Sequence, residues 1–353
     1  MTNNFVQRQD VQEIVDGLGD HAEQFAGKSV LITGGLGFLG RYFWAVLEHL
    51  NATTLRGREV HGMLVDSMIA CGAAVPPERD SKFVQFFKKD MSELDVPKYK
   101  VDFALHCAGI ASPFYYRQHP LETIDAAMSV RNTLEIAKAN PGCRVVFFSS
   151  SEIYGNPDAA HVPTRESYNG NVSCLGPRSV YDESKRLGET LVRAYNIAHG
   201  VPGMIVRPFN VVGPGMQHTD YRVLPNFAAR LVRGEPLQAY GDGKQTRTYC
   251  YVSDAIEGFL RVLLLGSPGE PYNIGNPSPE LSVLQFAERV SAAFGSDLKV
   301  DVVEHPDTYP ADEPQRRCPD ITKAREQIGY QPRVPLEEGL RRFAAWAQEN
   351  YPR

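Results

Sequence analysis

The feature that most constrains this chain is a glycine-rich turn between a short apolar run and a helical stretch. Val30-Leu31-Ile32 has the character of a buried strand, and the turn TGGLGFLG follows it directly. Glycines at this spacing let the backbone approach a pyrophosphate, and the N-terminus of the next helix supplies N–H donors. The strand–turn–helix context predicts a dinucleotide site. The residues expected to hold the cofactor there are Gly34, Gly37, Phe38, Leu39 and Gly40.

Strand-like and helix-like segments alternate beyond this turn. We predict strands at 60–65, 83–87, 101–105, 144–148 and 204–206, and helices at 38–49, 121–139 and 180–199. This alternation is typical of a parallel sheet with helices on both faces. After Pro208 the chain is irregular, although Ser282 with Gln285 forms a capping-box pattern and Pro335 suits the first turn of a helix. The predicted fold class is α/β, a Rossmann-type doubly wound parallel sheet with a smaller, discontinuous C-terminal substrate-binding part.

Three regions follow from this pattern. Residues 1–27 form an N-terminal helical extension, in which Val11, Ile14 and Leu18 share one face and Asp10 is the expected N-cap. This helix packs on the body or, in the alternative, binds a partner. Residues 28–208 form the dinucleotide-binding domain. Residues 209–353 mainly bind substrate, with some segments returning to the first domain.

Composition excludes several classes of function. The formal net charge of -5 and the lack of a Lys/Arg cluster argue against a nucleic-acid partner. No apolar run approaches the roughly 20 residues that span a bilayer, and the start MTNNFVQRQD lacks the layout of a signal peptide. We therefore expect a cytoplasmic protein. The six cysteines form no C-x-x-C pair, and the histidines show no metal-ligand spacing, so we expect reduced thiols and no metal.

Two acidic residues follow the next strands. Asp66 ends the second strand, where a carboxylate can accept hydrogen bonds from an adenosine ribose and repel a 2′-phosphate. This favours NAD over NADP, although Arg41 could argue the other way. Asp90 follows the third strand and is a candidate contact for the adenine, or simply a solvated loop acid.

Tyr181 and Lys185 stand four residues apart at the start of a predicted helix and so share one face. An ammonium group beside a phenol stabilises the phenolate, which could then take a hydroxyl proton near neutral pH. The lysine could also hold the nicotinamide ribose. The Y-x-x-x-K pattern alone is common, but its position after a glycine-rich turn and the strand end Ser149-Ser150-Ser151 makes it specific.

Taken together, these stretches resemble the extended short-chain dehydrogenase/reductase family from about residue 28 onward. The ordered matches are ASP (111–113), SEIYG (151–155), GPRSVYDESKRLGETL, RPFNVVGPGM, YGDGKQTRTYCYVSD, NIGNP and RCPDITKA. They look most like the branch of this family that converts UDP-glucuronate to UDP-xylose. The resemblance implies an NAD-dependent decarboxylation through a 4-keto sugar. The alternative is a 4-epimerase or a 4,6-dehydratase acting on another nucleotide sugar.

The same resemblance implies roles for the strand end. Tyr181 would deprotonate the sugar C4 hydroxyl with help from Ser150. Epimerases of the family generally carry a small or apolar residue at the position of Glu152, and dehydratases carry an Asp-Glu pair. The pair Ser151-Glu152 in this chain resembles the decarboxylase arrangement. The alternative for Glu152 is a structural salt bridge at the strand end.

Further positions carry over from the resemblance. Arg317 matches an arginine near the sugar C5, and Tyr116 a tyrosine near the sugar carboxylate. Their alternatives are an exposed ion pair and ordinary aromatic packing. The remaining expected contacts to the sugar nucleotide are Asn210, Arg222, Tyr240, Gln245 and Arg247.

Three positions depart from the decarboxylase pattern. Gly215 stands where an arginine is usual, Tyr221 replaces a glycine, and Cys318 replaces a lysine. The resemblance also implies a homodimer in which the helices near 121–140 and 180–199 pair across a two-fold axis.

Overall fold

A central parallel sheet organises the protein. The structure, a computed structural model, describes residues 5–69, 82–94, 99–304 and 313–353. Seven strands pair in the order β11-β6-β5-β4-β1-β2-β3, and every neighbouring pair is parallel. Their bounds are β1 Ser29–Thr33, β2 His61–Asp66, β3 Val84–Lys88, β4 Phe103–His106, β5 Arg144–Phe148, β6 Gly203–Pro208 and β11 Pro271–Ile274. The predicted doubly wound sheet is confirmed, and its strand order reverses between β1 and β4.

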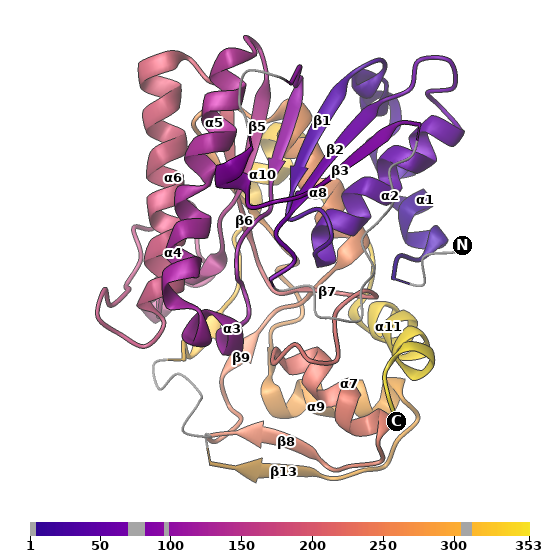
Figure 1. The fold of residues 1–353 in the computed structure, drawn as a ribbon. Coiled ribbons are helices and arrows are strands. Elements are labelled where there is room, and N and C mark those ends of the chain that lie inside the picture. The colour runs from indigo at the N-terminus through magenta and orange to yellow at the C-terminus, as the bar shows by residue number, and fades with distance from the viewer. Residues whose placement is uncertain (1–4, 70–81, 95–98, 305–312) are drawn as a thin grey trace.

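Helices cover both faces of this sheet. In Figure 1, α4 (Pro120–Met128), α5 (Val130–Ala139) and α6 (Ser179–His199) stand together at the left, and α1 (Arg8–Leu18) and α2 (Phe38–Ala52) at the right. Helix α8 (Val252–Leu265) packs on β5 and β6. Val30 and Ile32 of β1 belong to the core under α2 and α8, whereas Leu31 belongs to the core under α5 and α6. Side chains of one strand therefore alternate between two cores.

A smaller part lies beyond the carboxyl ends of the strands, below the sheet in Figure 1. It has its own core, to which α7 (Val223–Val232), α9 (Val283–Ala293) and α11 (Leu336–Asn350) contribute. Strands β8 (Leu237–Tyr240) and β13 (Val300–Val303) pair in parallel at its outer edge. The other elements are α3 Pro113–Gln118, β7 Val211–Val212, β9 Thr246–Arg247, β10 Cys250–Tyr251, β12 Leu281–Ser282, β14 Arg316–Arg317, α10 Thr322–Ile328 and 3₁₀ helices η1 Gly19–Phe25, η2 Met91–Glu93, η4 Ser151–Tyr154 and η5 Ala159–His161.

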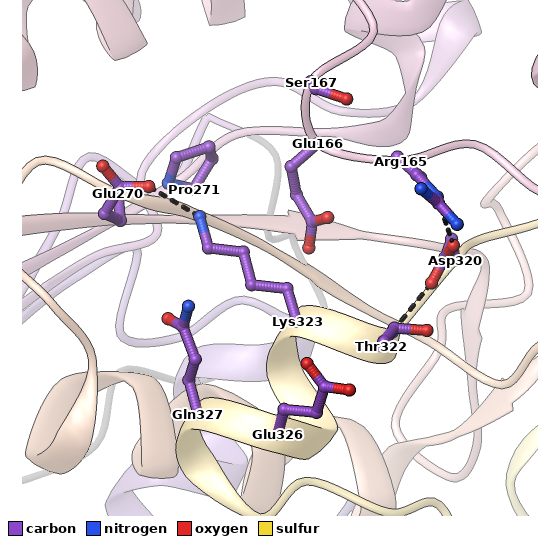
Figure 2. Close-up of a pocket in the computed structure, with 10 residues that line it drawn as sticks. All are labelled: Arg165, Glu166, Ser167, Glu270, Pro271, Asp320, Thr322, Lys323, Glu326 and Gln327. Carbon is purple, nitrogen blue, oxygen red and sulfur yellow. Dashed lines mark hydrogen bonds and ion pairs between the residues drawn. The ribbon is translucent and has the colours of Figure 1, made fainter.

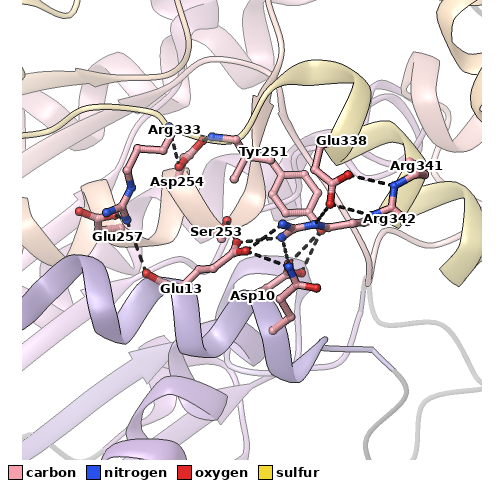
Figure 3. Close-up of polar contacts among 12 residues, drawn as sticks. Asp10, Glu13, Tyr251, Ser253, Asp254, Glu257, Arg333, Glu338, Arg341 and Arg342 are labelled. Atoms are coloured by element: carbon pink, nitrogen blue, oxygen red, sulfur yellow. Dashed lines mark hydrogen bonds and ion pairs between the residues drawn. The ribbon is translucent and has the colours of Figure 1, made fainter.

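The N-terminal helix differs from its prediction at one residue. Helix α1 begins at Arg8 after the N-cap Gln7, so Asp10 lies inside the helix and is not the cap. The Asp10 carboxylate is fully buried and accepts a hydrogen bond from Tyr42 at 3.1 Å. It also accepts hydrogen bonds from Tyr251 at 3.0 Å and Arg342 at 3.1 Å (Figure 3). Hydrogen bonds from residues far along the chain thus hold this side chain and fix α1 against the rest of the protein.

Other local predictions fare better. The capping box of Ser282 and Gln285 is present at α9, and Pro335 precedes α11. The predicted helix 121–139 is two helices, α4 and α5, that meet at Ser129. The described cysteines are free, and Cys71 lies outside the described residues. Among the helices that the structure describes, none is long and apolar enough to cross a bilayer.

Candidate active site

The glycine turn joins β1 to α2 at the edge of the sheet where the strand order reverses. Gly34 has a φ of +65°, which an L side chain rarely adopts. A Cβ at Gly40 would collide with the Gly34 carbonyl oxygen. Gly37 is the N-cap of α2. Helix α2 therefore packs closely against the turn, and its N-terminal N–H groups lie at the site.

Asp66 and Asp90 take up local hydrogen bonds beside this turn. The Asp66 carboxylate accepts the Leu36 N–H at 2.9 Å and the Met68 N–H at 2.7 Å, so it ties β2 to the glycine turn. Asp90 caps a 3₁₀ turn and accepts the Ser92 N–H at 2.9 Å. A carboxylate has room for further donors, so these contacts leave both acids able to meet a ribose or an adenine.

Two adjoining cavities share Gly34 and Gly37. The first, called here the glycine-turn cleft, also contains Phe38, Leu39, Gly40, Ser150, Ser151 and Lys185. The second extends to Asp66 and Asp90. A continuous hollow with helix N-terminal donors at its middle and acids at its outer end fits an elongated dinucleotide diphosphate. The predicted cofactor residues thus line one connected space.

Tyr181 and Lys185 lie in the first turns of α6, deep in the glycine-turn cleft. Burial raises the pKa of Tyr181 to about 12, against which a hydrogen bond with Ser150 acts. Burial lowers the pKa of Lys185 to about 8, and its ammonium donates to the Phe148 carbonyl at 2.9 Å. The ammonium lies 5.7 Å from the centre of the Tyr181 ring. In this structure, Ser150 is therefore the direct polar partner of the phenol.

Glu152 lies at the carboxyl end of β5 within a buried cluster of charges. Its carboxylate accepts hydrogen bonds from Arg317, one of them at 2.8 Å, and from Arg178. Burial alone would raise the pKa of Glu152, but these two arginines outweigh it and hold the pKa well below its usual range. Glu152 is consequently ionised and is oriented by two cations.

Sequence reasoning missed two members of this cluster. Arg178 donates to Glu313 at 2.7 Å as well as to Glu152, and Arg247 pairs with the same Glu313. The only signal for Arg178 was its position three residues before Tyr181. The only signal for Glu313 was its position four residues before Arg317, because its contacts with Arg178 and Arg247 depend on the tertiary fold.

A third hollow, called here the arginine cavity, meets the glycine-turn cleft at Glu152 and Tyr181. Apart from Arg222, which pairs with Asp220, the charged side chains on its wall are the buried Arg178, Arg247 and Arg317 and the half-buried Glu152 and Glu313. Three cations against two anions leave a formal surplus of one positive charge, which suits an anionic ligand. The structure brings the expected contacts Tyr116, Asn210, Arg222, Tyr240, Gln245 and Arg247 together on this wall.

Two of these residues already make contacts within the protein. Tyr116 is buried and stacks on Tyr181 with ring centroids 5.4 Å apart, and its hydroxyl has no hydrogen-bond partner within the described part of the chain. Arg222 pairs with Asp220 at 2.8 Å from its Nε. The Tyr116 hydroxyl is thus available to a ligand, whereas Arg222 already has an anion.

A further pocket lies elsewhere, between the segment 165–167 and helix α10 (Figure 2). The cations on its wall are each paired with a carboxylate of the same wall, Lys323 with Glu270 at 2.7 Å and Arg165 with Asp320 at 2.9 Å. This pocket contains none of the predicted site residues. The arginine cavity is therefore the better candidate for an anionic substrate.

The parallel sheet, the glycine turn and the Tyr-Lys pair define an enzyme class that works with a bound dinucleotide. Comparison with known proteins narrows the class. A sequence profile of the NAD dependent epimerase/dehydratase family matches residues 30–275. The chain belongs to this family, which confirms both the predicted resemblance and NAD as the cofactor.

Curated relatives extend along most of the chain. UDP-glucuronic acid decarboxylase 6 of Arabidopsis thaliana is 38% identical over 315 residues, which cover 88% of this chain and 86% of the relative. UDP-glucuronic acid decarboxylase 1 of Xenopus tropicalis is 38% identical over 318 residues, covering 89% of this chain and 70% of the relative. The similarity thus includes both the sheet and the smaller part.

Solved structures agree on the fold. An epimerase from Methanothermobacter thermautotrophicus superposes with a TM-score of 0.78 at 25% identity, over 94% of this chain and 95% of that one. A dTDP-glucose 4,6-dehydratase from Streptomyces venezuelae, solved with NAD bound, superposes with a TM-score of 0.76 at 26% identity. It covers 91% of this chain and 97% of the dehydratase.

Proposed function

We propose that this protein is an NAD-dependent decarboxylase that converts UDP-glucuronate to UDP-xylose. The observation that carries the proposal is Glu152, ionised between Arg178 and Arg317 where the arginine cavity meets the cleft that holds Tyr181. The similarity to curated UDP-glucuronic acid decarboxylases supports the choice of substrate.

Each part of the substrate has a matching part of the site. Arginines in the arginine cavity would pair with the diphosphate, which they can contact through two N–H groups at once. Tyr240 and Gln245 on the same wall would meet the uridine. The sugar ring would then lie near Glu152 and Tyr181, with its carboxylate close to the free Tyr116 hydroxyl.

The residues of the glycine-turn cleft would hold the cofactor. Gly34, Gly37 and Gly40 would admit its diphosphate, Asp66 would bind its ribose, and Lys185 would hold the nicotinamide ribose. When bound, NAD supplies a reversible two-electron oxidation, so that the sugar C4 alcohol becomes a ketone and is later restored.

The chain's own residues then handle protons and charge. Burial keeps the Tyr181 phenol protonated in the cofactor-free protein, and the positive charge of a bound nicotinamide would favour the phenolate. As a phenolate, Tyr181 would take the proton of the C4 hydroxyl, and Ser150 would orient that hydroxyl. The C5–C6 bond breaks, CO2 leaves, and the electron pair passes to the C4 carbonyl as an enolate that the proton held by Tyr181 can stabilise. C5 then takes a proton from solvent water, on the side where Arg317 and Glu152 form their ion pair. Glu152 fixes the Arg317 guanidinium beside the departing carboxylate.

The test is incubation of purified protein with UDP-glucuronate, followed by NMR of the sugar and detection of CO2. We expect a UDP-pentose, equimolar CO2 and no net change in NAD. A hexose that keeps C6 would instead identify an epimerase. Loss of water from a neutral hexose nucleotide, without turnover of UDP-glucuronate, would identify a dehydratase.

These alternatives rest on substrate-side residues that depart from the decarboxylase pattern. Tyr221 lines the arginine cavity, and Gly215 lines the glycine-turn cleft. Cys318 is buried and donates to the Pro277 carbonyl at 3.4 Å. Because the first two positions line the two cavities proposed for substrate and cofactor, other nucleotide sugars belong in the same assay.

We infer that the protein works as a cytoplasmic homodimer. Helix α4 exposes an apolar stripe made of Leu121, Ile124 and Met128, which are 71%, 41% and 42% exposed. Helix α6 lies beside α4 and exposes Leu187 (Figure 1). An apolar stripe across two neighbouring helices suits pairing with a second copy of the same stripe. The free thiols support the proposed compartment.

A further inference from the structure

The segment that precedes α1 reaches the glycine-turn cleft. Phe5 lines this cleft together with Gly37, Phe38 and Lys185. The Arg41 guanidinium lies 4.4 Å from the centre of the Phe5 ring, a cation–π contact. Phe5 also meets Trp346 of α11, with ring centroids 6.4 Å apart. One aromatic side chain thus connects the helix of the glycine turn with the last helix of the smaller part.

Gly215 provides the space for this segment. Its φ is +96°, and a Cβ there would lie 3.0 Å from the Phe5 carbonyl oxygen and 3.4 Å from the Phe38 ring. A long side chain at this position and the segment at Phe5 would compete for the same volume. The glycine at position 215, where an arginine is usual, therefore leaves room for the N-terminal segment at Phe5 to form one wall of the glycine-turn cleft.

Helix α1 anchors this wall. Asp10 is buried and accepts hydrogen bonds from Tyr42 and Tyr251. Arg342 donates hydrogen bonds to both Asp10 and Glu13 (Figure 3). The side chain of Arg342 comes from α11, so α1 is held by the smaller part as well as by the sheet. Phe5 lies only three residues before the first residue of α1, which restricts its position without burying it completely.

We propose that Phe5 retains NAD in the protein by forming a wall of the cleft that must move before the dinucleotide can leave. The inference rests on the NAD dependence of the family and not on the identity of the sugar. It gives the N-terminal extension a role at the site. Arg41, engaged with Phe5, belongs to this wall rather than to a site for a 2′-phosphate.

The experiment measures how fast NADH leaves the reloaded protein, by stopped-flow fluorescence with excess NAD as the competitor. We expect Phe5→Ala to release NADH about tenfold faster than wild type, a change that corresponds to about 1.4 kcal/mol. Phe5→Leu keeps apolar bulk and should release NADH at an intermediate rate. The thermal unfolding midpoint of each cofactor-free variant, compared with that of wild type, shows whether the fold is kept.

The matched control is Phe294→Ala. Phe294 is partly buried and packs on the core of the smaller part, as Phe5 does, but it does not line the glycine-turn cleft. Its variant should release NADH at the wild-type rate. The proposal is overturned if Phe5→Ala retains NADH as wild type does, or if Phe294→Ala accelerates release to the same degree.

Discussion

Glu152 is the residue on which the chemistry depends most directly. Glu152→Gln keeps the side chain's shape and one acceptor but removes the charge that fixes Arg178 and Arg317. We expect NAD binding to be kept and decarboxylation to fall by about a hundredfold or more, the usual scale for a lost group that orients charge at the reaction centre. The measurement is the initial rate of CO2 release, with cofactor affinity determined separately.

A neighbouring ion pair provides the control. Glu280 pairs with Arg316 at 2.7 Å, one residue before Arg317, but lines neither the arginine cavity nor the glycine-turn cleft. Glu280→Gln should keep the wild-type rate. Decarboxylation at the normal rate by Glu152→Gln would show that this carboxylate is only structural.

Tyr181 gives a prediction about its own ionisation. Burial raises its pKa to about 12. The Lys185 ammonium lies 5.7 Å from the centre of the ring and donates to the Phe148 carbonyl. The difference in near-ultraviolet phenolate absorbance between cofactor-free wild type and Tyr181→Phe should therefore stay flat from neutral pH to about pH 10. A midpoint near neutrality would mean that Lys185 already stabilises the phenolate.

The sequence predicted many residues of the site because they follow strands. The turn at Gly34 and the strand end at Ser150 must meet at the carboxyl edge of a parallel sheet, whatever the details of packing. Arg178 and Glu313 escaped prediction because their partners are set by tertiary contacts. The catalytic and binding roles of the individual residues remain predictions until the variants are measured.

At the scale of elements, helix α1 carries a pH-sensitive contact. Burial raises the pKa of Asp10 to about 6, despite hydrogen bonds from Tyr251 and Tyr42 and the nearby Arg342, which lower it. The folded protein thus holds this proton more tightly than the unfolded chain, in which the Asp10 pKa is 3.8. The resulting stabilisation is complete below about pH 4 and is lost as the pH rises through about 6.

Asp10→Asn removes this titration. We expect the free energy of unfolding of wild type, relative to that of the variant, to fall by on the order of 1 kcal/mol between about pH 5 and about pH 7.5. Denaturant unfolding of both proteins at the two pH values measures this difference. A constant difference, or one that grows with pH, would contradict the shifted pKa.

Element prediction succeeded where local pattern decides and failed where a distant contact does. The apolar run at 144–148 is strand β5 with the same bounds. Asp10 is a residue type that often caps a helix, but its carboxylate instead accepts hydrogen bonds from Tyr42, Tyr251 and Arg342. The junction at Ser129 stays in the helical region with ψ −18°, so hydrophobic periodicity continues across it and hides the division between α4 and α5.

For the whole molecule, the exposed stripe on α4 predicts the state of assembly. Replacing Leu121 and Ile124 together with Glu places charges in the proposed interface, where desolvation and mutual repulsion oppose pairing. Light scattering should then report the mass of one chain instead of two. Val302→Glu, at a 55% exposed aliphatic position on the outer edge strand β13, should leave the dimer intact. A wild-type protein that is monomeric would exclude the proposed interface.

The contact between Asp10 and Arg342 also imposes an order of events during synthesis. The two residues lie 332 positions apart, and a ribosome adds roughly 5 to 20 residues per second. The N-terminal helix therefore waits on the order of tens of seconds for the last helix to emerge. The sheet can form and meet its dinucleotide during that interval. Docking of the N-terminus then comes after the rest of the chain, as the final step of maturation.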